Sequence, residues 1–410
     1  MPLRENTART RPDRCPGVLA VHQAADGGLA RIRLPGGVLR TDQLQVLAAA
    51  SAELGDGNLE LTSRANLQIR ALRPNAAQAL SDRLYSAGLL PSISHERVRN
   101  VLASPLSGLD PQSLYDVLPA VAELDRQLCA RPTLAGLPGR FLFALDDGRG
   151  DLAGLGADVG IQALPGGQVA LLLAGADTGV RVPCQDLVPV MLAAAEAFLA
   201  ERAAENSEAW RLIELEDGIA RVLDRLRLAG SAGRTGPMKA DTPGNKGPTI
   251  GMVVGGGAAL VVGVPLGSLG AGEVEALVGV AGGSGEVRVT PWRSVVLGGV
   301  GVADVDGVVE LLGAAGLVVD PESPWGGVTA CAGRPGCAKA LADVRGDARR
   351  VTPRLPARSR VVHWSGCARR CGRPAGEFVD VVALDNGYLV DGLVTSKDDA
   401  AGAIAARRKQ

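Results

Sequence analysis

The sequence repeats itself, and this repeat constrains the fold more than any other feature of the chain. A stretch that begins at Gly27 has a counterpart that begins at Ala258. Each copy predicts an alternating strand, a turn at Pro35 or Pro265, an apolar-periodic helix and a second alternating strand. The order of these elements predicts an α+β unit with its helices on one face of a sheet.

The spacing within the two copies also agrees. An Ala-Gly-Leu segment follows the second strand of each copy, and its glycine lies 26 residues after the strand's threonine. The pairs are Thr62 with Gly88, and Thr290 with Gly316. A chance similarity in composition does not keep such spacing, so we infer an internal duplication.

Each copy is followed by a segment that mixes predicted strands and helices. Residues 186–228 are rich in Ala, Leu, Glu and Arg at helical spacing and predict two helices separated near Asn206. Residues 230–248 are rich in Gly, Pro and polar residues and predict a linker or surface loop. We therefore expect a first half-domain, a first α/β module, a linker, a second half-domain and a second α/β module, at residues 16–90, 91–229, 230–248, 249–320 and 321–410.

Four of the seven cysteines form two close pairs. Cys331 and Cys337 have a C-x5-C spacing, and Cys367 and Cys371 have a C-x3-C spacing. Four converging thiolates hold either an iron–sulfur cluster or a structural zinc ion. Zinc ligand pairs usually have two to four intervening residues, so the wider first pair favours a [4Fe–4S] cluster.

The other three cysteines carry a weaker signal. Cys129 and Cys184 lie in apolar stretches and are typical of core packing, whereas Cys15 is compatible with a surface thiol or an N-terminal clamp. An odd number of cysteines fits a disulfide framework poorly. The polar, Arg-rich N-terminus has no apolar signal segment, and the apolar runs are too short to span a bilayer. We expect a reducing, cytoplasmic setting.

Arginines are the second chemical signal. The chain has 43 Lys and Arg against 44 Asp and Glu, a balance that excludes a broad basic surface for nucleic acid or for an anionic membrane. Arg64, Arg97 and Arg99 nevertheless cluster with turn residues near predicted strand ends of the first half. Guanidinium groups in such positions pair bidentately with the carboxylates of an anionic ligand.

Five segments together resemble one family. LTSRANLQIR, RVRNVLASP, LPGRFLFALDDG, CAGRPGC and HWSGCARRC, in this order, are similar to the sulfite/nitrite reductase family of iron–sulfur proteins. The resemblance implies duplicated ferredoxin-like half-domains and two appended α/β modules that bind a cluster and a tetrapyrrole. It implies a [4Fe–4S] cluster on the four paired cysteines, with Cys371 also bridging to the iron of sirohaem in the reductases. His363 is expected to pack near the cluster.

The same resemblance assigns tetrapyrrole-binding roles to arginines. Arg64, Arg99 and Arg140 match basic positions of the family, and Arg97 lies in the same loop as Arg99. One departure stands out. Sirohaem reductases carry two lysines two residues apart, where this chain has Arg140 and Leu142. Leucine supplies neither a proton nor a charge, which weakens a sulfite reductase reading.

Within the family, the segment RCPGVLAVHQAADGGLARIRLPGG is most similar to the branch that oxidises precorrin-3A to precorrin-3B in aerobic cobalamin biosynthesis. This branch implies an O2-dependent monooxygenase that hydroxylates C20 of the tetrapyrrole and closes a γ-lactone. It also implies electrons derived from NADH and a mononuclear non-haem iron, for which His95 is the candidate ligand. The alternatives are a sirohaem-dependent sulfite or nitrite reductase and a non-catalytic iron–sulfur electron carrier.

The chain has no convincing nicotinamide motif. The nearest approach to G-x-G-x-x-G begins at Gly255 and has Leu260 in place of the third glycine. We therefore expect electrons to arrive through a separate reductase or ferredoxin.

Overall fold

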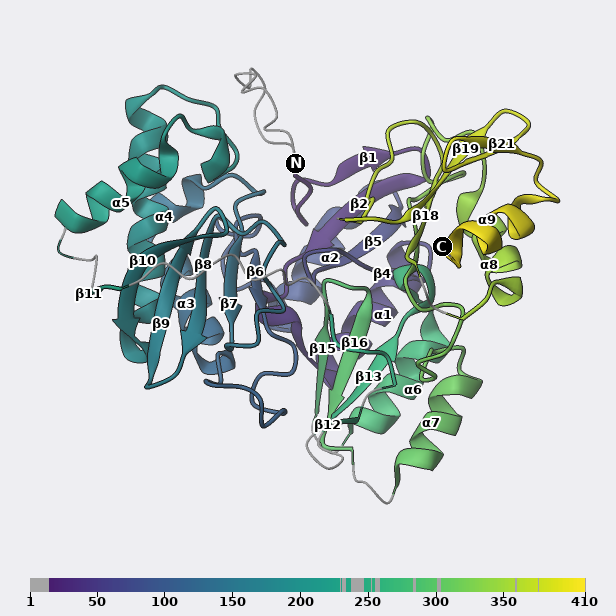
Figure 1. Cartoon of the computed structure of the whole chain (residues 1–410), viewed down its shortest axis with the longest axis horizontal. Coiled ribbons are helices and arrows are strands. Elements are labelled where there is room, and N and C mark those ends of the chain that lie inside the picture. Colours follow the sequence, from purple (N-terminus) through teal and green to yellow (C-terminus); the bar gives the residue numbers. More distant parts are fainter. Residues whose placement is uncertain are drawn as a thin grey trace.

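The computed structural model describes residues 15–228, 230, 234–236, 247–251, 253–254, 259–282, 285–300, 304–357, 360–374 and 376–409. Gly255 and most of the predicted linker lie outside these residues. The strands of the described residues form four sheets. In Figure 1 the two half-domains (purple and green) lie in the middle, with one α/β module on the left (teal) and the other on the right (yellow).

The first half-domain has the predicted order of elements. It consists of β1 (His22–Ala24), β2 (Gly27–Ile32), α1 (Thr41–Leu54), β4 (Leu59–Leu61), β5 (Leu67–Leu72) and α2 (Ala76–Ser86). Ala30 and Ile32 of β2 and Ile69 of β5 point into the core that α1 and α2 cover, whereas Arg31 and Gln68 face away from it. This alternation is the period of two that the sequence predicts.

The second half-domain repeats this order. It consists of β12 (Val253–Val254), β13 (Ala259–Gly263), α6 (Ala271–Ala281), β15 (Glu286–Val289), β16 (Ser294–Gly298) and α7 (Val305–Ala314). The two glycines that mark the repeat spacing follow the last helix of each half. Both have positive φ, 72° at Gly88 and 90° at Gly316. A residue in this region ends a helix, and glycine adopts it without steric cost.

The two halves exchange short strands. β3 (Val38–Arg40) belongs to the first half but pairs with β15, and β14 (Ser268–Leu269) belongs to the second half but pairs with β4. Helices α1 and α6 pack against each other, and one hydrophobic core runs through both halves. The sequence predicts the two halves as separate ranges and gives no sign of this exchange. The exchange depends on contacts between residues more than 200 positions apart.

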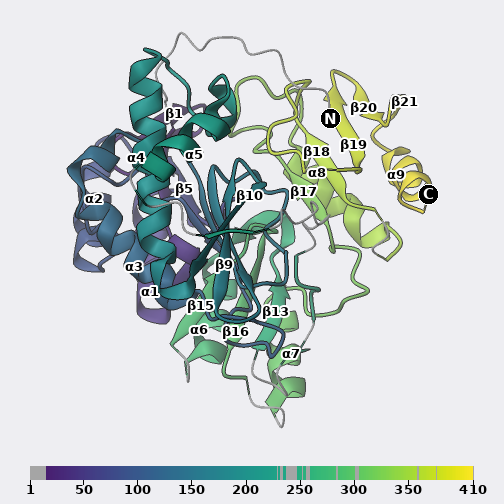
Figure 2. The same ribbon diagram turned by 60° about the vertical axis from the view of Figure 1, so that its left-hand side comes forward.

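The first α/β module contains a mixed sheet of β6 (Val101–Ala103), β7 (Phe143–Asp146), β8 (Val159–Leu164), β9 (Gln168–Leu173), β10 (Ala176–Pro183) and β11 (Arg234–Thr235). Its helices are α3 (Leu118–Cys129), α4 (Leu187–Ala204) and α5 (Gly218–Leu228). Helix α4 runs along the left of the strands β9 and β10 in Figure 2, and it packs on β8 and β9. The two helices predicted between residues 186 and 228 are thus confirmed as α4 and α5, whereas β11 forms an edge strand inside the predicted linker.

The second α/β module is smaller. It contains β17 (Val328–Ala330), β18 (Val362–Ser365), β19 (Val379–Leu384), β20 (Gly387–Val390), β21 (Leu393–Thr395), α8 (Val344–Val351) and α9 (Ala400–Arg408). Trp364 and Tyr388 form the centre of its core, with ring centroids 5.0 Å apart. Burial of such large aromatic side chains is a major source of stability in a small module.

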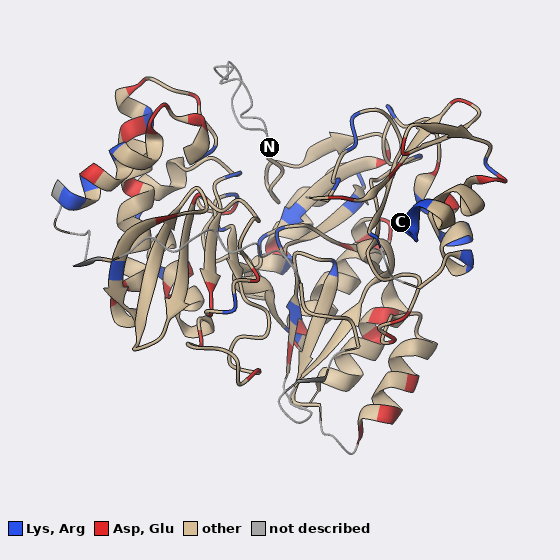
Figure 3. Cartoon of the chain, in the orientation of Figure 1, with Lys and Arg blue, Asp and Glu red and all other residues tan. Residues whose placement is uncertain are grey.

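None of the helices among the described residues is both long enough and apolar enough to cross a membrane. Basic and acidic residues are interspersed along most helices and loops in the view of Figure 3.

Candidate functional site

The four paired cysteines lie at one edge of the second α/β module. β17 and β18 are parallel neighbours, so their carboxyl ends meet at the same edge of the sheet. Cys331 directly follows β17, and Cys367 follows β18 by two residues. The backbone N–H of Cys331 donates to the Trp364 carbonyl at 2.9 Å, and the N–H of Gly366 donates to the Cys331 sulfur at 3.1 Å. The sheet thus brings the two cysteine motifs together.

The thiols are close enough to influence one another. Burial raises the pKa of the Cys371 thiol, and the charges of Cys331, Cys367 and Cys337 raise it further. All seven cysteines are free, and Cys371 is exposed. Yet the described residues contain no group of three or more His, Cys, Asp and Glu side chains arranged to hold a metal ion.

Four thiols can hold either a single zinc ion or an iron–sulfur cluster. Zinc holds its thiolates within about 2.3 Å of one point, whereas a four-iron cluster holds them further apart on separate iron atoms. The free N–H of a glycine directed at Cys331 is the kind of hydrogen bond that tunes cluster sulfurs. The four cysteines are therefore a donor set that suits a [4Fe–4S] cluster.

His363 lies beside the C-x3-C loop, as the resemblance implies. Its Nδ1 is 2.8 Å from the Thr329 hydroxyl, and its Nε2 is 3.1 Å from the Cys371 carbonyl. Burial, followed by the charge of Arg293, lowers the pKa of His363 to about 4. The imidazole is therefore neutral at physiological pH, and it fixes the position of the Cys371 loop.

The polar face of the first half-domain's sheet contacts the cysteine loops. The Arg70 guanidinium donates to the Gly336 carbonyl at 2.8 Å and pairs with Asp26 at 3.0 Å. From the other side, Arg345 pairs with Glu60 of β4 and donates to the Cys331 carbonyl at 3.2 Å. These contacts anchor the C-x5-C motif to the first half of the chain.

The same polar face continues to the N-terminal segment. The Cys15 sulfur accepts from Arg31 at 3.4 Å and from Arg33 at 3.6 Å. Arg33 is 3% exposed, and its Nη1 has no hydrogen-bond partner among the described residues. Burial lowers the pKa of Arg33 to about 10. Sequence reasoning missed Arg33, although its alternation with core residues along β2 placed it on the polar face.

Arg64 lies in the same neighbourhood. Its backbone belongs to the turn that joins β4 and β5, and its guanidinium has no hydrogen bond or ion pair with the described residues. Burial and then the charge of Arg211 lower the pKa of Arg64 to about 10, and Cys15 and Arg33 also act on it. Neither Arg33 nor Arg64 forms an ion pair with the described residues, although the charge of Glu96 acts on Arg33 and that of Asp158 on Arg64. Buried guanidinium groups of this kind are suited to binding an anion.

The other predicted arginines differ from Arg64. The Arg99 guanidinium is 4% exposed and forms a bidentate ion pair with Asp125, with both distances 2.7 Å. It also donates to the Leu89 carbonyl. The expectation that Arg99 binds a tetrapyrrole is therefore at odds with this structure, because its donors are committed to an ion pair that sequence spacing does not reveal.

Arg97 and Arg140 lie at the margins of the region that contains Arg33 and Arg64. The Arg97 carbonyl accepts from Arg33 at 3.2 Å, and its side chain is partly buried beside Gly17. Arg140 is exposed, with its guanidinium carbon 5.0 Å from the centre of the Trp210 ring, a cation–π contact. Leu142 is 1% exposed and belongs to the hydrophobic core.

His95 has no free nitrogen in this structure. Its Nδ1 is 2.8 Å from the Ser92 hydroxyl, and its Nε2 is 3.0 Å from the Arg131 carbonyl. Both ring nitrogens are occupied by protein partners, so the geometry does not fit His95 as an iron ligand. Sequence position placed it near the arginine loop but could not reveal these partners.

Comparison with known proteins agrees with this architecture. Two regions, residues 22–87 and 252–315, match the family described as the nitrite/sulfite reductase ferredoxin-like half domain. The matched regions correspond to the duplicated units, so the predicted resemblance and the predicted fold are confirmed.

Relatives extend the similarity over most of the chain. A precorrin-3B synthase from Sinorhizobium sp. is 28% identical over 402 residues, which cover 93% of this chain and 83% of that protein. A ferredoxin–nitrite reductase from Synechococcus elongatus is 27% identical over 407 residues, covering 89% and 78%. The solved structure of the NirA protein of Mycobacterium tuberculosis has the same fold, with a TM-score of 0.74, 21% identity and coverage of 92% and 79%.

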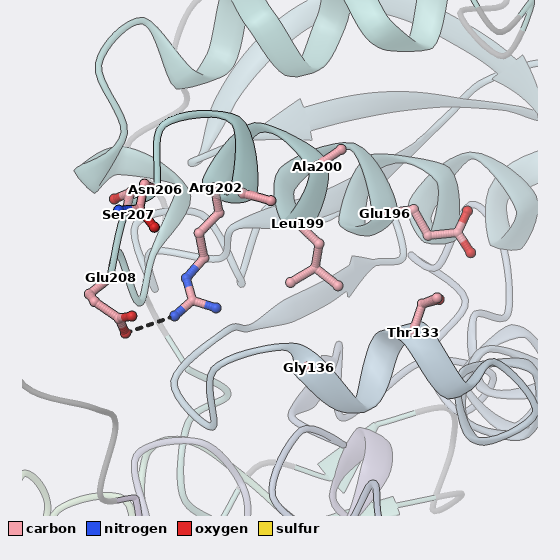
Figure 4. A pocket seen from close by; sticks show the side chains of 10 residues that line it. Thr133, Gly136, Glu196, Leu199, Ala200, Arg202, Asn206, Ser207 and Glu208 are labelled. Atoms are coloured by element: carbon pink, nitrogen blue, oxygen red, sulfur yellow. Dashed lines mark hydrogen bonds and ion pairs between the residues drawn. The ribbon is translucent and has the colours of Figure 1, made fainter.

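A separate cavity lies on the far side of the first α/β module. It has a volume of about 720 Å³ and opens between α4 and the turn Pro132–Gly136. Figure 4 shows Leu199 in its floor and the Arg202–Glu208 ion pair at one end. The residues that line it include none of the predicted site residues, so it is not the candidate site.

Proposed function

We propose that the chain is an O2-dependent oxidoreductase that converts precorrin-3A to precorrin-3B by hydroxylation at C20 and γ-lactone formation. Overall similarity does not choose between this reaction and nitrite reduction, because the two relatives are 28% and 27% identical. The observation that carries the choice is Leu142. Where the resemblance expects the second of two lysines, an apolar side chain is buried in the core. A sirohaem reductase that must protonate its bound anion lacks that proton source here.

The residues have separate roles in this proposal. Cys331, Cys337, Cys367 and Cys371 hold the cluster, which supplies electrons one at a time when bound. Arg33 and Arg64 bind carboxylates of the tetrapyrrole, because their guanidinium groups are desolvated and form no ion pair with the described residues. Arg70 and Arg345 hold the C-x5-C loop against the first half-domain, to which Arg33 and Arg64 also belong.

The reaction requires reducing equivalents. One oxygen atom of O2 enters the substrate, and the other leaves as water with two protons and two electrons. We propose that the electrons derive from NADH and arrive through a separate reductase or ferredoxin. No step is assigned to a mononuclear iron, because both ring nitrogens of His95, the candidate ligand, are occupied by protein partners. A reducing cytoplasm would keep the seven cysteines free, as they are in the structure.

The deciding experiment is a turnover assay with precorrin-3A. The cluster-loaded protein is incubated anaerobically with precorrin-3A, and ¹⁸O2 and a reductant are then added. The expected product carries one oxygen atom from O2, measured by mass spectrometry. An unchanged substrate mass under conditions in which the cluster is reduced and reoxidised would contradict the proposal.

The second candidate is a sirohaem-dependent sulfite or nitrite reductase. It is favoured by the near-equal similarity to a ferredoxin–nitrite reductase. Absorption spectra separate the two: bound sirohaem gives Soret and Q bands, whereas a protein with the cluster alone gives broad absorption. Sirohaem bands in the purified protein, together with nitrite- or sulfite-dependent oxidation of the reductant, would establish this candidate instead.

A further inference from the structure

The duplication places a second arginine in a turn equivalent to that of Arg64. In the first half the N–H of Thr62 donates to the Asn66 carbonyl at 2.9 Å, and in the second half the N–H of Thr290 donates to the Ser294 carbonyl at 2.9 Å. The residue at the fourth position of each turn has positive φ, 53° at Ala65 and 57° at Arg293. This conformation costs a non-glycine residue about 1–2 kcal/mol, and such strain is typical of functional sites.

The side chain of Arg293 reaches from the half-domain to the cysteine loop. Its aliphatic part crosses Gly267 so closely that a Cβ at that glycine would lie 2.6 Å from the Arg293 Cδ. At its far end, Nη2 lies 3.5 Å from the Cβ position of Gly372, the residue after Cys371. The absence of a side chain at Gly267 is what lets the Arg293 side chain pass toward the Cys371 loop.

The guanidinium has no partner there. It makes no hydrogen bond or ion pair with any of the described residues. Glu60, the nearby acid, already pairs with Arg345, and the Arg345 charge repels Arg293. His363, which also faces it, has its two ring nitrogens at the Thr329 hydroxyl and the Cys371 carbonyl and offers it no acidic group. Burial lowers the pKa of Arg293 as well. A desolvated cation without a counter-charge is unfavourable, so an anion is the expected occupant.

We propose that Arg293 is a second carboxylate-binding site, which holds a carboxylate of the tetrapyrrole beside the Cys371 loop. The inference rests on the proposed function, because a polycarboxylate tetrapyrrole supplies the anion. Arg64 lies in the turn of the first half, next to the first α/β module. Arg293 lies in the equivalent turn of the second half, next to the second α/β module. Two turns related by duplication would then orient one ligand.

The test is a binding titration with uroporphyrin III, a stable polycarboxylate tetrapyrrole. Cluster-loaded wild-type protein is compared with Arg293→Gln, Arg293→Lys and the control Arg126→Gln, which changes an exposed arginine of α3. Loss of one charge-assisted hydrogen bond weakens binding by about tenfold or more. We expect such a rise in Kd for Arg293→Gln, a smaller rise for Arg293→Lys, no change for the control and unchanged iron content in all.

The outcomes distinguish failure of the proposed tetrapyrrole function from failure of the role proposed for Arg293. If wild-type protein does not bind uroporphyrin III, the tetrapyrrole function and this inference both fail. If wild-type protein binds it and Arg293→Gln binds equally well, this inference alone is wrong. A shifted cluster reduction potential with an unchanged Kd would assign Arg293 to the cluster and also overturn the inference. If Arg293→Gln does not fold, Arg293→Met, which keeps the chain across Gly267, replaces it with the same expected result.

Discussion

The two α/β modules share a sheet topology but present different chemistry at the same edge. In the first module β6, β7 and β8 are parallel and β9 and β10 follow antiparallel, and β17 to β21 of the second module repeat this order. The pairing registers place Ser104 at the position of Cys331. The N–H of Ser104 donates to the Leu145 carbonyl at 3.1 Å, as that of Cys331 donates to Trp364 at 2.9 Å.

The hydrogen bond to the side-chain oxygen of Ser104 has an equivalent at the side-chain sulfur of Cys331. The N–H of Asp147 donates to the Ser104 hydroxyl at 3.1 Å, and the N–H of Gly366 donates to the Cys331 sulfur at 3.1 Å. In the first module, however, carboxylates surround the serine: Ser104 donates to Asp151 at 2.7 Å, and Asp147 pairs with Arg149 at 2.9 Å. The backbone thus sets the position and the residue type sets the chemistry.

The largest effect is expected from the cysteines of the second module. Cys331→Ser and Cys371→Ser should each lose the cluster, because a hydroxyl is a poor replacement for a thiolate ligand. Iron and sulfide analysis should fall from about four iron atoms per chain to near zero. Cys129→Ser, in the first module, is the control and should keep full iron. Full iron in Cys331→Ser would show that the shared edge does not carry the cluster.

The second prediction concerns Asp151, the buried carboxylate that accepts from Ser104 in the first module. Burial, and then the charge of Asp146, raises the pKa of Asp151 to about 7 from its usual 3.8. The folded state therefore binds this proton more tightly, and this part of the stability is lost as the pH rises from about 4 to about 7. The contribution is at most about 4 kcal/mol at 1.36 kcal/mol per pKa unit.

Asp151→Asn should remove this pH dependence. Urea unfolding at pH 5 and pH 8 is the measurement, and the variant should gain stability over the wild-type protein at pH 8. The Asn side chain can still accept from Ser104, so the hydrogen bond is preserved. Equal pH profiles for the two proteins would mean that Asp151 titrates normally.

A third change tests whether Arg99 stabilises the first module through its ion pair with Asp125 or binds a ligand. Asp125→Ala leaves the buried Arg99 guanidinium without its carboxylate, which should cost about 3 kcal/mol. The midpoint of urea unfolding should fall, and the affinity for uroporphyrin III should stay the same. Tighter binding in this variant would instead assign Arg99 to the tetrapyrrole, as the sequence predicts.

The smallest effect is expected from Arg64→Ala. Loss of one guanidinium should weaken uroporphyrin III binding by about tenfold, or about 1.4 kcal/mol, with the iron content unchanged. Fluorescence titration beside an Arg126→Ala control measures this. An unchanged Kd would place the carboxylate-binding face away from this turn.

The sequence predicted some of this site better than the rest. The cysteine pairs were evident because their spacing is local, and the strand that precedes each pair fixes where it points. Arg64 and Arg99 looked alike in sequence, since both lie in loops near strand ends. Their difference comes from Asp125, 26 positions from Arg99, which only the packing of α3 brings into contact. Arg33 and Arg293 were not singled out, because the burial of a guanidinium group without an ion pair has no signature in a single sequence.

By itself, the sequence determined the duplication, the order of elements in each half and the four thiols for a cluster. These follow from short-range periodicity and spacing, which act through neighbouring backbone and a few side chains. Only the tertiary structure decided that the halves exchange strands, that Ser104 stands where Cys331 stands, and which arginines are neutralised. Such decisions depend on contacts between residues far apart in the chain, and their energies follow from burial and pairing, which no local pattern encodes.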